Sequence, residues 1–244
     1  MKFGIYPGGR AGVVSSRPPD LLAIDRLVAE LAQGNPFVVR EYVHFFGRGS
    51  AARDRAEVEA LGAGRALERL TMPDDWYVAD RRELDLVVSY LPVEADVEGW
   101  LEFLDAVVER YGHLVRYLQV TLEPNFPIPL IDGSSPGVLD ALTQGIPHAR
   151  KALAARGSVG TEVGFSVAEP AEWLGGDDAF WDHLSRQEDF ARHVDYVGLG
   201  LYPDAFSPVP AEAVAPLTEH ALVHLRHRCA EVGLDVPIHI AENG

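Results

Sequence analysis

The sequence has few cysteines and few lysines, and each shortage excludes a kind of chemistry. Cys229 is the only cysteine among 244 residues, so the chain forms no internal disulfide, which fits a reducing compartment. Lys2 and Lys151 are the only lysines, and they fall at the start of a predicted strand and on a predicted helix. A Schiff-base aldolase needs a strand lysine in the barrel mouth, so the sequence argues against that reaction.

Long apolar runs and excess positive charge are also missing. No stretch approaches the ~20 apolar residues that span a bilayer. The first ten residues, MKFGIYPGGR, lack the apolar run of a signal peptide, so we expect a cytoplasmic protein without membrane contact. The net charge is −16, and nucleic-acid binding depends on cationic contacts to phosphate, so we expect no nucleic-acid partner. An acidic surface serves solubility and does not repel a neutral sugar.

Seven short apolar runs rich in Val, Ile and Leu predict parallel strands that are buried on both faces. The runs are Lys2–Tyr6, Phe37–His44, Leu84–Leu91, Val115–Leu122, Gly160–Val167, Tyr196–Leu201 and Val236–Ala241. Helical periodicity occupies the segments between them, at Leu21–Leu31, Arg53–Leu70, Val97–Tyr111, Pro136–Arg156, Asp178–His193 and Ala211–Val232. This alternation predicts an α/β fold of the (β/α)₈ TIM-barrel type, as one domain over residues 1–244.

A doubly wound open sheet would give the same alternation of strands and helices. Such a sheet usually has a glycine-rich loop after its first strand, and Gly8, Gly9 and Gly12 invite the comparison. Their spacing does not give G-x-G-x-x-G, and Pro7 and Arg10 interrupt the expected turn into a helix. We therefore prefer the barrel. We predict neither a nucleotide cofactor nor a cofactor of another kind.

The carboxyl ends of the predicted strands carry acidic and aromatic residues. In α/β barrels the reacting groups lie at these ends. Reading only the strand ends gives Tyr6, Arg40 to Tyr42, Tyr90, Glu123, Glu169, Tyr202 and Glu242. Two carboxyl groups with aromatic rings around them are the groups that glycoside hydrolysis uses, so a carbohydrate or glycoconjugate substrate is expected.

Three motifs in strand order make a more specific pattern. LEPN lies at the end of predicted strand 4, at residues 122–125. DYVGLGLYP contains predicted strand 6, at residues 195–203, and AENG lies at the end of predicted strand 7, at residues 241–244. The chain thus resembles the large clan of barrel-fold retaining glycoside hydrolases, which carries an acid/base Glu at the end of strand 4 and a nucleophile Glu at the end of strand 7. The resemblance implies Glu123 as acid/base and Glu242 as nucleophile.

The same resemblance implies roles for neighbouring residues. Tyr202 would orient the nucleophile, and Arg40 matches the clan's arginine on strand 2 or else forms a rim ion pair. Asn125 is expected near the substrate. Phe126, Trp173 and Phe206 follow strands 4, 5 and 6, where each either stacks on a sugar ring or packs within the protein.

Two features depart from the clan. Leu122 precedes Glu123 where the clan usually has an Asn that binds the sugar 2-hydroxyl. An eighth βα unit of about 30 residues does not fit after Glu242. The chain is then either a fragment of a longer product, truncated after strand 7, or an incomplete barrel, and we expect the fragment. These departures keep open the alternative of a non-catalytic carbohydrate-binding barrel.

A metal site is not expected. His220, His224 and His227 recur at helical spacing, but beside the apolar stripe of the last helix and away from the strand ends. We interpret them as a solvated helix flank. The sequence carries no signal for the sugar, its linkage or anomer, endo or exo action, or the oligomeric state.

Overall fold

The computed structural model describes residues 2–7, 19–54, 56–57, 70–169, 177–203 and 208–243. The strands are β1 (Phe3–Ile5), β2 (Phe37–Phe45), β3 (Arg82–Tyr90), β4 (Val115–Val120), β5 (Glu162–Ala168), β6 (Tyr196–Leu201) and β7 (Ile238–Asn243). The helices are α1 (Leu21–Ala32), α3 (Val97–Tyr111), α4 (Val138–Ala155), α5 (Asp177–Ser185) and α6 (Ala211–Glu231). Short 3₁₀ turns, η1 to η4, cover Gly49–Ala51, Asp74–Val78, Asp132–Ser134 and Ala191–His193.

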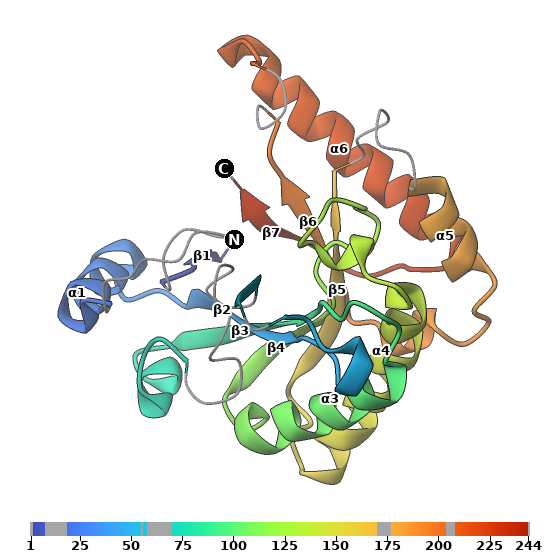
Figure 1. The fold of residues 1–244 in the computed structure, drawn as a ribbon. Helices are drawn as coiled ribbons and strands as arrows, with labels where there is room; N and C mark the ends of the chain where they lie inside the picture. The colour runs from blue at the N-terminus through green and yellow to red at the C-terminus, as the bar shows by residue number, and fades with distance from the viewer. Residues whose placement is uncertain are drawn as a thin grey trace.

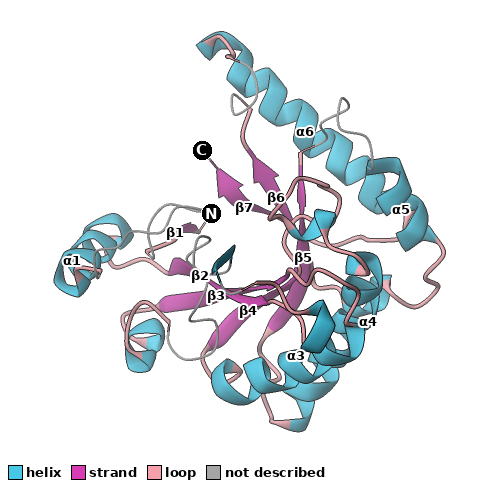
Figure 2. Cartoon of the chain, viewed as in Figure 1, coloured by secondary structure: helices cyan, strands magenta, loops and turns pink. Residues whose placement is uncertain are grey.

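All seven strands are parallel and pair in chain order, β1 to β7. The sheet curls into part of a barrel, and α3, α4, α5 and α6 lie on its outer side (Figures 1 and 2). The predicted α/β barrel class is therefore confirmed. The described residues contain seven strands and no eighth.

The main core fills the space between the outer face of the sheet and the helices. Leu86, Leu118 and Val120 of the sheet are almost fully buried, as are Trp100 of α3 and Ile146 of α4. The continuous apolar runs of the sequence thus correspond to strands covered on their outer face. Side-chain caps start two helices, since Asp20 accepts from the Ala23 amide and Asp96 accepts from the Gly99 amide.

Several predicted bounds differ from the structure. One helix was expected over 178–193, but α5 ends at Ser185 and η4 follows at 191–193. The chain turns between them and places the buried Phe190 ring against Phe165, with centroids 5.9 Å apart, so packing overrides the helical pattern. Strand β7 extends to Asn243, so Glu242 lies within the strand and not after it. The helix predicted over Arg53–Leu70 and the loop with Gly8, Gly9 and Gly12 lie almost entirely outside the described residues.

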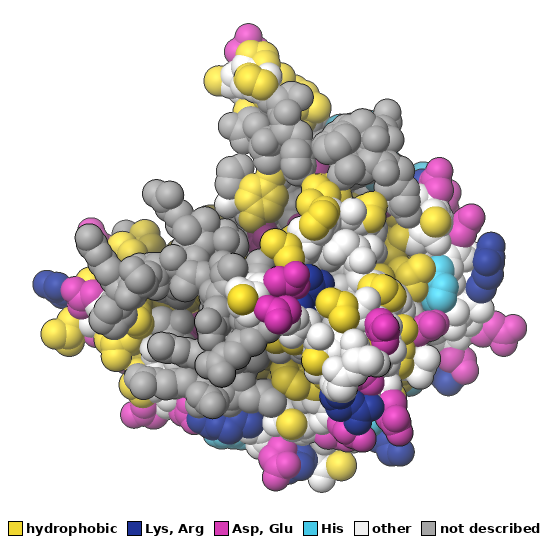
Figure 3. All heavy atoms as spheres, viewed as in Figure 1, with side chains coloured by type: hydrophobic (Ala, Val, Ile, Leu, Met, Phe, Trp, Pro, Cys, Tyr) yellow, Lys and Arg dark blue, Asp and Glu magenta, His cyan; other side chains and the backbone are white. Residues whose placement is uncertain are grey.

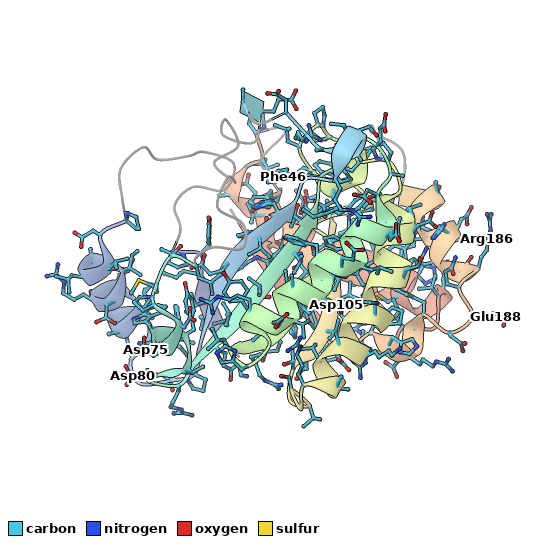
Figure 4. The ribbon with its side chains drawn as sticks, turned by 60° about the horizontal axis from the view of Figure 1, so that its bottom comes forward. Phe46, Asp75, Asp80, Asp105, Arg186 and Glu188 are labelled. Atoms are coloured by element: carbon cyan, nitrogen blue, oxygen red, sulfur yellow. The ribbon has the colours of Figure 1, made fainter. Side chains whose placement is uncertain are left out.

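Because the strands are parallel, their carboxyl ends share one rim. Figure 4 shows Phe46, just beyond β2, at the opposite end of the sheet from Asp80, which precedes β3. We call the inner side of the sheet at the Phe46 end the mouth. Figure 3 shows acidic and basic side chains interspersed with apolar ones over one face of the molecule. Among the described helices, none is long and apolar enough to cross a membrane.

Candidate active site

Glu242 of β7 lies at the centre of a hydrogen-bond network in the mouth. Its Oε1 accepts from the Tyr42 hydroxyl at 2.6 Å and from Arg40 Nη2 at 3.3 Å. Its Oε2 accepts from the Tyr202 hydroxyl at 2.9 Å. All three contacts stabilise a negative charge on Glu242 and fix the direction of its carboxylate.

Arg40 is buried on the inner face of β2, and its guanidinium is held from several sides. It donates to Tyr42 Oη at 2.8 Å, to Gln119 Oε1 at 2.8 Å and to Asp85 Oδ2 at 2.5 Å. The Arg40 and Glu242 side chains are only 7% and 15% exposed, so the alternative of an ion pair at a solvated rim does not describe this contact. The sequence placed Arg40 near a strand end, whereas it lies in mid-strand and reaches across the barrel interior.

Glu123 lies beside this network, at the same end of the sheet. Its carboxyl group rests over Gly200 of β6, where any Cβ would collide with Oε1. Gly200 is the register partner of Glu242 on β7. Adjacent strands lie about 4.8 Å apart, so the two glutamates, 119 positions apart in the sequence, approach each other over neighbouring strands at the same rim.

The surroundings of Glu123 disfavour its ionised form. Burial is the largest cause, and the negative charge of Glu242 adds to it, so the pKa of Glu123 rises from 4.5 to about 8. The positive charge of Arg40 opposes this rise. At neutral pH Glu123 is therefore mainly protonated and able to donate a proton, while its neighbour Glu242 is held by groups that favour a charge.

The turn that carries Glu123 is strained. Thr121 and Glu123 both have left-handed backbone angles, with φ of 69° and 48°. A β-branched residue such as Thr rarely adopts this conformation, and each such residue costs roughly 1–3 kcal/mol. The hydroxyl of Thr121 is buried without a hydrogen-bond partner among the described residues. Strain of this kind is typical of functional sites.

An aromatic row follows the inner face of β2 toward the rim. Tyr6 meets Tyr42 edge-on at 4.8 Å between ring centroids. Tyr42 stacks with His44 at 6.4 Å, and His44 with Phe46 at 5.8 Å. Burial lowers the pKa of His44 to about 4, so its ring is uncharged at neutral pH. The sequence analysis gave no role to Tyr42 or His44, although their alternation with Arg40 placed all three on one face of the strand.

The remaining predicted site residues have different surroundings. Asn125 is buried and its amide is used internally: Nδ2 donates to the Ala168 carbonyl and to Asp177, while Oδ1 accepts from the Ala168 amide. Both Nδ2 protons are thus used within the protein, which leaves this amide no free N–H donor for a ligand. Phe126 is only 9% exposed, which favours the packing alternative over a sugar platform. Trp173 and Phe206 lie outside the described residues.

The structure offers no assembled metal site in its described part. No group of three or more His, Cys, Asp or Glu side chains gathers there in a way that could hold an ion. Of the three helix histidines, His227 lies near Glu231 of its own helix, at 3.3 Å, and His224 lies 3.7 Å from Asp177 of α5. All of these contacts are on the outer helices, away from the mouth.

Comparison with known proteins gives structural neighbours only. No model of a protein family matches the chain, and no curated protein matches it. A β-glucosidase from Exiguobacterium antarcticum matches with a TM-score of 0.54 at 14% identity, over 99% of this chain and 77% of that one. A hyperthermophilic β-glucosidase mutant matches with a TM-score of 0.53 at 13% identity, over 91% and 70% of the two chains.

A β-glucuronidase from Bacteroides uniformis matches with a TM-score of 0.54 at 10% identity, over 99% of this chain but only 24% of that one. At such identities the likeness concerns the fold and not the chemistry. The chain has the half-barrel α/β fold of glycoside hydrolases.

Proposed function

We propose that this chain carries the active site of a retaining O-glycoside hydrolase, with Glu123 as acid/base and Glu242 as nucleophile. The observation that supports this most is the pairing of a buried, mainly protonated Glu123 with a Glu242 that three donors hold. One carboxyl group able to donate a proton beside one held for attack is the arrangement this reaction needs. The β-glucosidase neighbours support the substrate class, a neutral glycoside.

The reaction follows from these roles. Glu242 attacks the anomeric carbon, the glycosidic C–O bond breaks, and the leaving oxygen takes the proton of Glu123. Glu123, now ionised, then accepts a proton from water, and the oxygen of that water displaces Glu242 from the sugar. Each glutamate ends in its starting state, and the product keeps the configuration of the substrate.

One observation favours a second candidate, a non-catalytic sugar-binding barrel. Leu122 stands where the resembled clan has the Asn that binds the 2-hydroxyl, and its backbone amide is bound to Asp132. Loss of the contact to the 2-hydroxyl removes several kcal/mol of transition-state stabilisation. A barrel without that contact could bind sugar and turn it over slowly or not at all.

The test uses a panel of aryl glycosides with the unchanged chain, Glu123→Gln and Glu242→Gln. Glu98→Gln is the matched control, because the Glu98 side chain on α3 is 88% exposed. We expect the unchanged chain and the control to hydrolyse a glycoside, and both active-site variants to have kcat lowered by about 10³-fold or more. NMR of the first product should show the same anomer as the substrate. Calorimetric sugar binding without turnover would favour the binding barrel, and an inverted product would overturn the retaining mechanism.

A further inference from the structure

Asp132 is a completely buried carboxylate in the loop between β4 and α4, and its partners are unusual. Its Oδ1 accepts from the Ser89 hydroxyl at 2.5 Å. Its Oδ2 accepts from the amides of Tyr90 at 2.7 Å and Leu122 at 2.8 Å. Ser89 and Tyr90 end β3, whereas Leu122 directly precedes Glu123, so one side chain joins the ends of two neighbouring strands.

The conformation of the turn before Glu123 depends on hydrogen bonds to other parts of the chain. Three successive amides of this turn each donate to a different element: Thr121 to the Val88 carbonyl at 2.9 Å, Leu122 to Asp132, and Glu123 to Ser166 Oγ at 3.2 Å. The left-handed angles of Thr121 and Glu123 do not persist without surroundings that impose them. Asp132 supplies the only carboxylate among these three acceptors, and hydrogen bonds to a charged acceptor are the stronger kind.

Asp132 also acts on Glu123 through its charge. Burial raises the pKa of Asp132 to about 7, while its three donors oppose the rise. The negative charge of Asp132 raises the pKa of Glu123 and so helps to hold the proton on Glu123. The other charged or titratable groups that face Glu123 are Glu242 of β7, Glu169 after β5, Tyr202 after β6 and Arg40 of β2.

We propose that Asp132 is a positioning residue, which locks the turn before Glu123 and so aims the Glu123 carboxyl group into the mouth. The catalytic meaning of this role rests on the proposed function, whereas the placement of Glu123 by Asp132 does not. Asp132 touches no reacting atom itself. It acts through the backbone of Leu122 and through its charge.

The test compares Asp132→Asn and Asp132→Ala with a buried carboxylate elsewhere. Glu41 is a matched control: it is 4% exposed, accepts from Tyr77 and Thr71 on the outer side of β2, and burial raises its pKa to about 7. The main readout is the carbon-13 NMR titration of the Glu123 carboxyl group, assigned with Glu123→Gln, because it needs no substrate. The melting temperature is recorded for every variant.

Asp132→Asn should shift the titration midpoint of Glu123 downward, while Glu41→Gln lowers the melting temperature and leaves that midpoint in place. If Asp132→Asn does not fold, Ser89→Ala removes one donor to Asp132 and should shift the midpoint in the same direction by less. The proposal would be overturned if Asp132→Asn folds and leaves the Glu123 titration midpoint unchanged. If Asp132→Asn does not fold, an unchanged midpoint in Ser89→Ala would overturn it.

Turnover separates the two proposals. Asp132→Ala should lower kcat by about 10²-fold with little change in KM, because a reacting group misplaced by about 1 Å costs this much. A shifted Glu123 midpoint in a chain that turns over no glycoside would keep Asp132 as the residue that places Glu123 and would reject the hydrolase. An active enzyme whose kcat and Glu123 titration midpoint are unchanged by the Asp132 substitutions would support the hydrolase and reject the positioning role of Asp132.

Discussion

Replacing Gly200 by Ala should disable the site while leaving the fold almost intact. A Cβ at Gly200 would lie 1.9 Å from Glu123 Oε1, whereas real Cβ atoms keep at least 3.0 Å, so the oxygen must retreat by about 1.1 Å. The backbone of Gly200 is ordinary strand, and a carboxylate at the end of a flexible side chain moves more easily than β6. A displacement of this size costs about 10²-fold in kcat, which is about 2.7 kcal/mol of transition-state stabilisation.

The assay is steady-state kinetics with an aryl glycoside, together with the melting temperature. Gly145→Ala on α4 is the control, since its Cβ would lie 2.7 Å from Trp100 Nε1 and 3.0 Å from Val120 Cγ1, crowding the outer core without touching the Glu123 carboxylate. We expect both variants to lose a few degrees in melting temperature and Gly200→Ala alone to lose about 10²-fold in kcat. Equal losses of kcat in the two variants, or full activity of Gly200→Ala, would refute the reasoning.

Four further predictions concern the same network. Tyr42→Phe and Tyr202→Phe should each lower kcat by about 10- to 100-fold and the melting temperature by a few degrees, because a hydrogen bond to a charged group is worth about 1.5–3 kcal/mol; wild-type kinetics in both variants would argue against Glu242 as nucleophile. Arg40→Met should lower the free energy of unfolding in urea by about 3–5 kcal/mol, because it leaves buried carboxylates unpaired; a loss below about 1 kcal/mol would contradict a buried pair. Activity should fall as the pH rises through about 8, the pKa of Glu123. The raised pKa also means that stability declines as the pH rises from 4.5 to about 8. Glu123→Gln should reduce that decline in a melting series, and the part that remains comes from Glu41 and Asp132, whose pKa values burial also raises to about 7.

The sheet could be predicted from the sequence because β2 to β6 are short, largely apolar runs buried by their neighbours and helices, whereas β1 and β7 are only partly buried or exposed. All seven predicted runs overlap the seven observed strands. Ends were less accurate, as in β7, where His239, Ala241 and Glu242 are only partly buried and the apolar pattern weakens before the strand stops. The overlong helix prediction after Asp178 failed because the burial of Phe190 is a tertiary contact that helical periodicity does not encode.

The candidate site was predictable where the chemistry follows strand order. Strand ends gave Glu123, Glu169 and Glu242, because parallel strands bring such ends to one rim, and the resemblance to the clan then selected Glu123 and Glu242. The role of Tyr42 could also have been predicted, since Tyr42 lies two residues after Arg40 on the same face of β2. Asp132 was not, because it lies in a loop among Pro, Gly and Ser, and its partners on β3 and β4 become its neighbours only in the folded chain. Gly200 was quoted within a motif, but the need for an empty Cβ position appears only when Glu123 lies above it.

The charged groups around the Arg40 guanidinium bear on the charge of the ligand that the mouth can bind. With Glu123 mainly protonated at neutral pH, the carboxylates of Asp85, Glu242 and, in part, Asp132 outweigh the single positive charge of Arg40 around the mouth. The resulting negative potential would attract the positive charge that develops on an oxocarbenium-like sugar during bond cleavage. It would repel a uronic acid or a sugar phosphate before either could bind, so the electrostatics that keep the proton on Glu123 would also select uncharged carbohydrates.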